Sequence, residues 1–310
     1  MSRAMRAGGI APRQAGLAVV TALLVVALAA AAVGAMAWRE RMWVRQVANL
    51  EDAAQADAVA RAGIAWAGAI LAQEGRQSGI DDLGQLWARP LPPVAVGSGS
   101  VAGNVTDAQS RFNLNDLAGV GGGSAQDVAA FRRLLVLLDL PPELAGAVAD
   151  WVSPPYPGAL DAYYLAQEPP YRDAHRPLTD VDELYRIKGF DARIVERLRP
   201  FVTALPGYTP VNVNTAPAEV LAAVFPGLGL REAQALVASR GDAYFQSQAD
   251  FAGRLTAGQL AGVRDQAFSV NSQYFLVHVH IRYHRVRVTE KALLYRARGS
   301  GTQILWKKVS

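Results

Sequence analysis

The stretch LAVVTALLVVALAAAAVGAMAW, residues 17–38, decides how this chain is organised. It holds 22 residues without a charge, and about 20 apolar residues are enough to span a bilayer as a helix. The polar leader before it, residues 1–16, carries three arginines and ends at Gly16. We therefore expect residues 17–38 to form a single membrane-spanning helix.

The position of Gly16 relative to the apolar run indicates how the chain is processed. Secretory signals are cut after their apolar stretch at a small-residue site, whereas prepilin leaders are cut before it, after a glycine. We interpret Gly16–Leu17 as a prepilin-peptidase site, which leaves the apolar helix on the mature protein. Two alternatives stay open, a plain membrane anchor and a cleaved signal ending at Ala35-Met36-Ala37. The run exceeds the roughly 7–15 residues of a typical signal core, which favours the first interpretation.

Charge and composition narrow the location and the function classes. The leader arginines favour a cytoplasmic N-terminus, although Arg39, Arg41 and Arg45 beyond the span weaken that preference. We expect a single pass through the inner membrane, with the C-terminal domain in the periplasm. The lack of cysteine excludes disulfides and thiol catalysis. Neither a G-x-S-x-G, an H-E-x-x-H nor a Walker signature occurs in the sequence, so we expect no enzyme.

The helix is expected to continue beyond the membrane through residues 39–75. There is no proline from Arg39 to Glu74, and Gly75 is a candidate C-terminal cap. Apolar residues recur there at steps of three and four, which predicts a stripe that packs on a globular head. The stripe consists of Val47, Leu50, Ala54, Ala58, Ala62, Trp66 and Leu71.

The rest of the chain predicts a small sheet interrupted by helices. Short β-like runs lie within residues 76–117, and helical periodicity follows in residues 118–265. Apolar and polar residues alternate at the start of residues 266–310, where we expect three antiparallel strands. The predicted fold class is α+β, with a long N-terminal helix and a small antiparallel sheet that is interrupted by a large inserted α-helical domain.

Several motifs, in this order and at this spacing, carry a resemblance to one family. They are AGLAVVTALLVVALA at 15–29, RFNLNDL at 111–117, DWV at 150–152, DAYYLAQEPPYRDAHRPLTDVDELYRIKGF at 161–190 and NVNTAPAEVLAAVFPGL at 212–228. The chain resembles the type II secretion system minor pseudopilin K (GspK) family. The resemblance implies a pilin-like fold with a helix-hairpin-helix or SAM-like element in the inserted domain. It also implies a place at the tip of the pseudopilus, which supports protein export across the outer membrane.

The resemblance implies partners as well. These are the minor pseudopilins I and J, the major subunit of the pseudopilus and the prepilin peptidase. Most pilins and pseudopilins carry Glu at mature position five, which is Thr21 when Leu17 is counted as the first residue. A carboxylate in lipid is costly unless it is paired, and its expected partner is the terminal amine of the subunit above. A subunit at the tip has no such neighbour, so Thr21 agrees with that place; a tolerated small residue is the alternative.

Calcium bound in loops of the inserted domain is a further implication of the resemblance. The candidate ligands are Asp150, Asp161, Asp173 and Asp180. Calcium takes six to eight oxygen ligands, but three oxygen-donor positions of the family pattern are altered here, at Ser153, Leu160 and His175. The alternative is that these aspartates cap helices and complete turns.

A membrane-anchored DNA-binding protein is the alternative function. Residues 211–240 resemble the helix-hairpin-helix of competence-type DNA receptors, in which Gly-x-Gly lets backbone amides approach a phosphate. Gly227 and Gly229 match that pattern. However, Arg231 is followed at once by Glu232, and the basic cluster that phosphate binding requires is missing. We therefore expect no nucleic acid as a partner.

Overall fold

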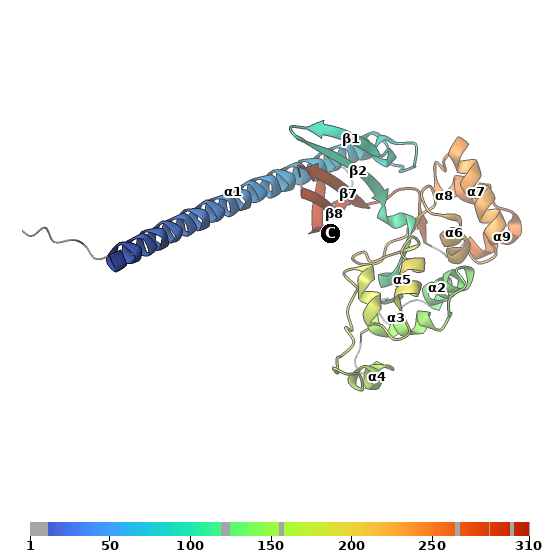
Figure 1. The fold of residues 1–310 in the computed structure, drawn as a ribbon. Helices are drawn as coiled ribbons and strands as arrows, with labels where there is room; N and C mark the ends of the chain where they lie inside the picture. Colours follow the sequence, from blue (N-terminus) through green and yellow to red (C-terminus); the bar gives the residue numbers. More distant parts are fainter. Residues whose placement is uncertain are drawn as a thin grey trace, which may run out of the picture.

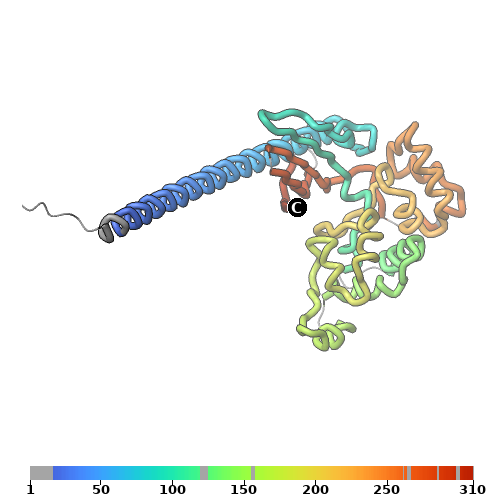
Figure 2. The backbone as a smooth tube through the Cα atoms, viewed as in Figure 1, coloured from blue at the N-terminus to red at the C-terminus, as the bar shows by residue number. Residues whose placement is uncertain are grey.

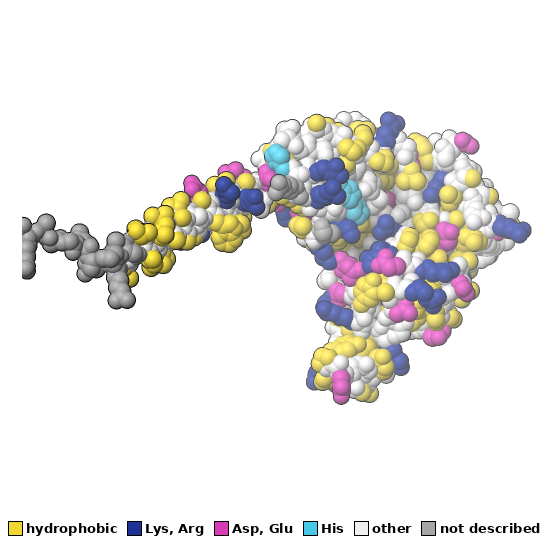
Figure 3. All heavy atoms as spheres, in the orientation of Figure 1, with side chains coloured by type: hydrophobic (Ala, Val, Ile, Leu, Met, Phe, Trp, Pro, Cys, Tyr) yellow, Lys and Arg dark blue, Asp and Glu magenta, His cyan; other side chains and the backbone are white. Residues whose placement is uncertain are grey.

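One long helix, α1 (Pro12–Gln77), carries the chain from the leader into a mixed α/β head (Figure 1). The computed structural model describes residues 12–118, 125–154, 158–263, 267–284, 286–297 and 301–309, so most of the predicted leader lies outside the described residues. Residues 17–46 of α1 are exposed throughout, and this part of the helix is long and apolar enough to cross a membrane. Apolar side chains cover that part, whereas charged side chains are spread over the head (Figure 3).

The last part of α1 packs on one face of a five-stranded antiparallel sheet with the order β1-β2-β7-β8-β9 (Figure 1). The strands are β1 (Leu91–Val96), β2 (Gly99–Asp107), β7 (Tyr274–Tyr283), β8 (Val286–Arg296) and β9 (Thr302–Val309). The three C-terminal strands confirm the prediction from alternation. Phe275, Val277 and Val279 project from β7 into the core that this face shares with α1.

The predicted stripe on α1 is wrong, because a different face of the helix packs on the sheet. Leu50 and Trp66 are 70% and 52% exposed, and only Leu71 of the predicted set is buried. The buried face consists of Ala56, Ala60, Ile64, Ala67 and Leu71. At Gly68 the helix and the sheet approach too closely for a side chain. A Cβ added at Gly68 would lie 2.5 Å from the Thr302 hydroxyl.

Gly75 is not the C-terminal cap that the sequence predicts, since α1 continues to Gln77. Instead, the side chain of Arg296 from β8 lies over the helix at this position, where an added Cβ would be 3.0 Å away. The Arg296 guanidinium donates to the Leu71 carbonyl and pairs with buried Asp81. The glycine is therefore needed for close approach rather than for ending the helix.

The helical insertion leaves the sheet at the end of β2 and returns at the start of β7, where Asp107 lies opposite Phe275. It thus takes the place of a hairpin loop, a position at which chain ends lie close together and insertions are tolerated. The chain path shows the insertion at the end of the head that is remote from the membrane half of α1 (Figure 2).

The insertion consists of two units that close in the same way. In the first unit β3 (Phe112–Asn113) pairs in parallel with β4 (Val202–Thr203), and in the second β5 (Val211–Asn212) pairs in parallel with β6 (Phe268–Ser269). The first unit contains α2 (Ala125–Leu137), α3 (Leu144–Val152), α4 (Asp161–Leu165) and α5 (Ala192–Leu198). The second contains α6 (Ala218–Val224), α7 (Leu230–Asp242), α8 (Gln248–Gly253) and α9 (Ala257–Val263). Short 3-10 helices complete the chain: η1 (Leu86–Ala88), η2 (Ala108–Ser110), η3 (Leu114–Ala118) and η4 (Val181–Arg186).

Buried asparagines hold both units together. Asn115 pairs with both backbone groups of Leu178, donating to its carbonyl at 2.9 Å and accepting from its N–H at 2.7 Å. Asn214 pairs with Phe245 in the same way, at 2.9 and 2.7 Å. Buried backbone groups outside regular structure need partners, and these side-chain amides supply them. The motifs that contain these asparagines carried the family resemblance, but their structural role was not predicted.

Candidate assembly helix and carboxylate–histidine cluster

Thr21 lies on the exposed apolar half of α1, four residues after Leu17. Its hydroxyl lies 3.1 Å from the Leu17 carbonyl and 3.0 Å from the Ala18 carbonyl, so its hydrogen bond is made within its own helix. Local bonding of this kind allows a hydroxyl to enter an apolar span without a partner from elsewhere. Gly16 and Leu17, the predicted processing residues, both lie within α1.

Large apolar side chains remain exposed on α1 beyond the predicted span. Trp43 is 65% exposed, Leu50 is 70% exposed and Trp66 is 52% exposed. They lie outside the face that packs on the sheet. Around the helix Trp43 and Leu50 lie about 20° apart, whereas Trp66 lies about 160° from Leu50. Because exposed apolar surface can mark an interaction site, these side chains, on two sides of α1, are the candidate assembly contacts.

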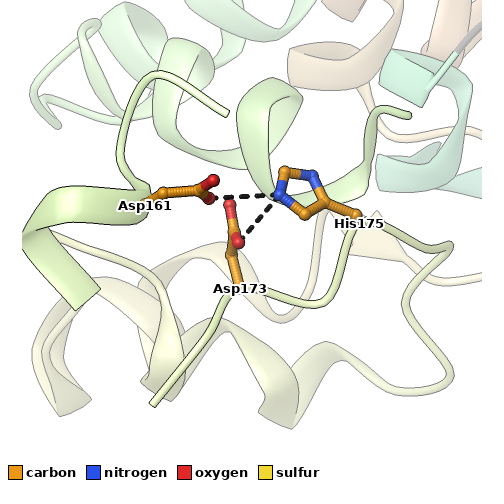
Figure 4. A group of neighbouring side chains, drawn as sticks. All are labelled: Asp161, Asp173 and His175. Atoms are coloured by element: carbon orange, nitrogen blue, oxygen red, sulfur yellow. Dashed lines mark hydrogen bonds and ion pairs between the residues drawn. The ribbon is translucent and has the colours of Figure 1, made fainter. Parts of the chain in front are cut away.

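Three of the four predicted metal-binding aspartates come together in the first unit of the insertion. Asp161 begins α4, Asp173 lies in the loop that follows, and His175 points between their two carboxylates (Figure 4). The His175 Nε2 atom lies 3.1 Å from Asp161 Oδ1 and 2.9 Å from Asp173 Oδ1. Gly158 closes one side, where an added Cβ would lie 3.1 Å from Asp150 Oδ2. We call Asp161, Asp173 and His175 the carboxylate–histidine cluster.

Burial makes the charge of this cluster costly. The Asp173 side chain is 1% exposed, and within the part of the chain that the structure describes its Oδ2 atom has no hydrogen-bond partner. Burial, followed by the neighbouring Asp161 carboxylate, raises the pKa of Asp173 to about 6. Burial lowers the pKa of His175, but its bond to the Ser153 carbonyl and the two carboxylates outweigh this and raise that pKa. The cluster therefore favours a positive charge at its centre.

Asp180, the fourth predicted ligand, does not join the cluster. It caps η4, accepting a hydrogen bond from the Asp182 N–H at 2.8 Å. Its second carboxylate oxygen pairs with Lys308 of β9. Asp180 thus links the insertion to the sheet and caps η4, as the alternative interpretation of these aspartates describes.

The donors present in the cluster do not match those that calcium prefers. Calcium takes six to eight oxygens, whereas a ring nitrogen of His175 faces the centre here. The Asp150 carboxylate already accepts the backbone N–H groups of Ala159 and Leu160, at 2.7 and 3.0 Å. Calcium stays a prediction of the resemblance, and the donor chemistry of these residues argues against it.

The hairpin of α6 and α7 is built for packing rather than for phosphate. Gly227 adopts a φ of +88°, as a tight turn between helices requires. At Gly229, however, the Glu232 carboxylate lies against the backbone at the start of α7, where it would repel a phosphate. Arg240 turns inward and donates to the Val213 carbonyl at 2.7 Å. The alternative of a DNA-binding hairpin is therefore not favoured.

A long apolar helix packed on a small antiparallel sheet, with a helical insertion between neighbouring strands, defines a subunit of pilin-like architecture whose helix is long and apolar enough to anchor it in a membrane. Residues 110–207 and residues 211–271 each match a family described as type II secretion system protein K. These two ranges correspond to the two units of the insertion.

Similar proteins cover nearly the whole chain. Type II secretion system protein K of Pseudomonas aeruginosa is 37% identical over 284 residues, which is 85% of this chain and 83% of that protein. The protein K of Klebsiella pneumoniae is 34% identical over 302 residues, or 91% and 92% of the two chains. The solved structure of the GspK-GspI-GspJ complex from enterotoxigenic Escherichia coli contains a chain with a TM-score of 0.76 and 25% identity, covering 86% of this chain and 99% of that one.

The chain belongs to the type II secretion system protein K family and is a minor pseudopilin of type II secretion. The expectation that it is not an enzyme agrees with membership of a family of secretion-system subunits. The predicted fold class is confirmed by the long helix, the antiparallel sheet and the inserted helices.

Proposed function

We propose that this minor pseudopilin caps the pseudopilus and, from that place, supports protein export across the outer membrane. The observation that carries this proposal is the place of the insertion, which lies at the end of the head remote from the membrane half of α1 (Figure 1). Mass at this end obstructs the stacking of another subunit above. Thr21 supports the same place, because its hydroxyl is satisfied within α1 and brings no carboxylate that needs a partner.

The minor pseudopilins I and J are the partners in this proposal, since the solved relative was crystallised with GspI and GspJ. The exposed Trp43, Leu50 and Trp66 offer apolar contacts to neighbouring helices in the periplasm. Within lipid, the small residues Ala29–Ala32 and Gly34 allow helices to approach closely. The major subunit would pack along the same helix from below.

Maturation by a prepilin peptidase at Gly16–Leu17 precedes assembly in this proposal, with the N-terminus in the cytoplasm and the head in the periplasm of an inner-membrane protein. The test is Gly16→Leu, which should leave an unprocessed precursor and abolish export, because the bulky side chain blocks the cleavage site. Mass spectrometry of the N-terminus and an export assay give the readouts. Gly9→Leu, a matched change in the leader away from the site, should be processed normally. A mature chain that begins at Trp38 would contradict the proposal.

The partner surface has a separate test. Full-length protein is co-purified in detergent with the neighbouring minor pseudopilins, and Leu50→Glu or Trp66→Glu should strongly reduce their recovery. Tyr244→Glu is the control, because Tyr244 is 42% exposed but lies in the insertion. Equal loss in all three variants, or recovery of the unaltered protein always alone, would show that α1 is not the contact.

A further inference from the structure

We infer that the carboxylate–histidine cluster binds a transition-metal ion of the Zn²⁺ class, with His175 Nε2, an Asp161 oxygen and an Asp173 oxygen as ligands. One potential ligand atom from each of these residues lies within 4.8 Å of the others. The inference concerns the choice of metal, and it does not depend on the proposed place of the protein in the pseudopilus. It differs from the calcium that the resemblance implies, because the central nitrogen donor belongs to this chain's own His175.

The histidine ring is oriented as in a metal ligand. Its Nδ1 atom lies 3.1 Å from the Ser153 carbonyl, and a carbonyl can only accept, so Nδ1 carries the proton of that bond. In the neutral ring the lone pair is then on Nε2, the atom that faces both carboxylates. Metal-binding histidines almost always donate their other ring N–H to a carbonyl or carboxylate in this manner. Histidine nitrogen is a preferred ligand of zinc, copper, iron and nickel but not of calcium.

The distances between the donors also suit a metal of this class. Zinc binds nitrogen and carboxylate oxygen at about 2.0–2.2 Å, which places ligands of a tetrahedral site about 3.3 Å apart. The His175 Nε2 atom is 3.1 Å from Asp161 Oδ1 and 2.9 Å from Asp173 Oδ1. Only a small expansion of the cluster would be required.

Protonation of His175 is the alternative to metal binding in this cluster, and it leaves one carboxylate oxygen without a hydrogen-bond donor. Protonation of His175 supplies a single donor at Nε2 for two carboxylates. The Asp173 side chain is 1% exposed, and its Oδ2 atom, which lies 3.0 Å from a Cβ added at Gly158, has no hydrogen-bond partner among the described residues. A divalent ion accepts lone pairs from both aspartates and neutralises both charges. This buried oxygen without a partner is the second, independent indication of a cation.

The metal would tie α4 to the loop that follows it. Asp161 begins α4, and Asp173 and His175 lie in that loop. Binding to the folded state alone stabilises that state by mass action. We therefore expect the metal to raise the melting temperature of the whole protein as well as to saturate at one ion per chain.

The experiment uses full-length protein in detergent, freed of metal with a chelator, with Co²⁺ as a spectroscopic probe. One Co²⁺ per chain should bind and produce visible absorption bands of a tetrahedral site, and Zn²⁺ should displace it whereas Ca²⁺ should not. His175→Asn replaces the ring with an amide oxygen and should weaken Co²⁺ and Zn²⁺ binding by at least the roughly 10–100-fold that is lost when a hydrogen-bond partner of a metal ligand is removed. Asp161→Asn gives a second variant if the first does not fold.

Two matched controls separate the cluster from other histidines and aspartates. His280→Asn alters an exposed histidine on β7, and Asp180→Asn alters the aspartate that caps η4. Both should bind Co²⁺ as the unaltered protein does. Co²⁺ binding that survives both His175→Asn and Asp161→Asn overturns the inference. So does a cluster that binds Ca²⁺ in preference to Zn²⁺, and so does a protein that binds neither metal.

Discussion

The two units of the insertion are closed by the same kind of hydrogen bonds, but the loops that these bonds close differ in length and content. In each unit a two-residue parallel pairing joins the ends, and the first strand of the pairing ends at an asparagine, Asn113 or Asn212. A second asparagine two residues later, Asn115 or Asn214, pairs with both backbone groups of a distant residue. The partner of Asn115 is Leu178, 63 residues away, whereas the partner of Asn214 is Phe245, 31 residues away. The longer first loop contains the carboxylate–histidine cluster. The same strand pairing and asparagine bonds can therefore close a long loop as well as a short one, because the entropy cost of closing a loop grows slowly with its length.

The units also differ in the aspartate that accepts a hydrogen bond from Asn113 or Asn212. Asn113 donates to Asp116 at 2.7 Å, and Asn212 donates to Asp107 at 3.0 Å. Burial raises the pKa of Asp116 to about 8 but that of Asp107 only to about 6. The reason is the number of donors. Among the described residues, Asp107 accepts further hydrogen bonds from Ser272, Thr215 and Gln109, whereas Asp116 accepts one further bond, from the Thr209 N–H.

The largest loss of stability is expected from removing the asparagines that close the two units. Asn115→Ala and Asn214→Ala each leave at least one buried N–H and one buried carbonyl without a partner. At about 1–3 kcal/mol for each such group, we expect a loss of about 4 kcal/mol in the free energy of unfolding. Chemical denaturation of the full chain in detergent measures it. Asn104→Ala is the matched control, because half-exposed Asn104 lies on β2 of the sheet. If only one of the two variants loses stability, the asparagine bonds do not have equivalent roles in the two units.

Replacing each of the two buried aspartates by asparagine is expected to change stability in opposite directions. The folded pKa of Asp116 is raised above its ordinary 3.8, so its contribution to stability is complete below about pH 4 and is lost as the pH rises through about 8. Asp116→Asn keeps an acceptor oxygen for Asn113 and the Thr209 N–H. At about 1.4 kcal/mol per pKa unit, we expect this variant to equal the unaltered protein at pH 4, to exceed its stability by about 3 kcal/mol at pH 6, and to exceed it further as the pH rises to about 8.

Asp107→Asn should instead destabilise the protein at pH 7, because both oxygens of Asp107 accept hydrogen bonds and an amide nitrogen cannot. Denaturation at pH 4, 6, 7 and 9 compares the two variants. Parallel pH profiles for Asp116→Asn and the unaltered protein would show that Asp116 does not titrate in this range.

The smallest effect is expected at the link between the first unit and the sheet. Lys308→Gln removes the ion pair with Asp180, which is half-exposed on the lysine side. Pairs of this kind contribute about 0.2–1 kcal/mol and are screened by salt. The loss of stability should therefore be under about 1 kcal/mol and should shrink in 1 M salt. Lys291→Gln on the neighbouring strand is the control, and a loss that salt does not reduce would argue against an ionic link.

Local patterns explain which parts of the fold could be predicted. The three C-terminal strands follow from alternation, and α1 follows from an uninterrupted run of helix-compatible residues. The packed face of α1 was mispredicted, because periodicity locates apolar residues but does not report how near the sheet lies. Small residues and Gly68 face the sheet, and the large Trp66 faces outward.

The candidate cluster was predicted in part for the same reason. The sequence groups Asp161 with Asp173, which lie close together, but it neither places His175 between them nor separates Asp180 from them. Hydrogen bonds across distant segments decide these roles. His175 is held by Ser153, 22 residues away, and Asp180 meets Lys308, 128 residues away. A spacing of this size leaves no periodic signal in the sequence.

The sequence by itself determined the membrane helix, the strand-forming end and the family, because length, period and ordered motifs are properties of the chain alone. Only the tertiary structure decided which face of α1 meets the sheet, how four asparagines close two units, and which side chains surround His175. Those outcomes depend on the distance of approach between elements and on the pairing of buried backbone groups, and both exist only once the chain has folded.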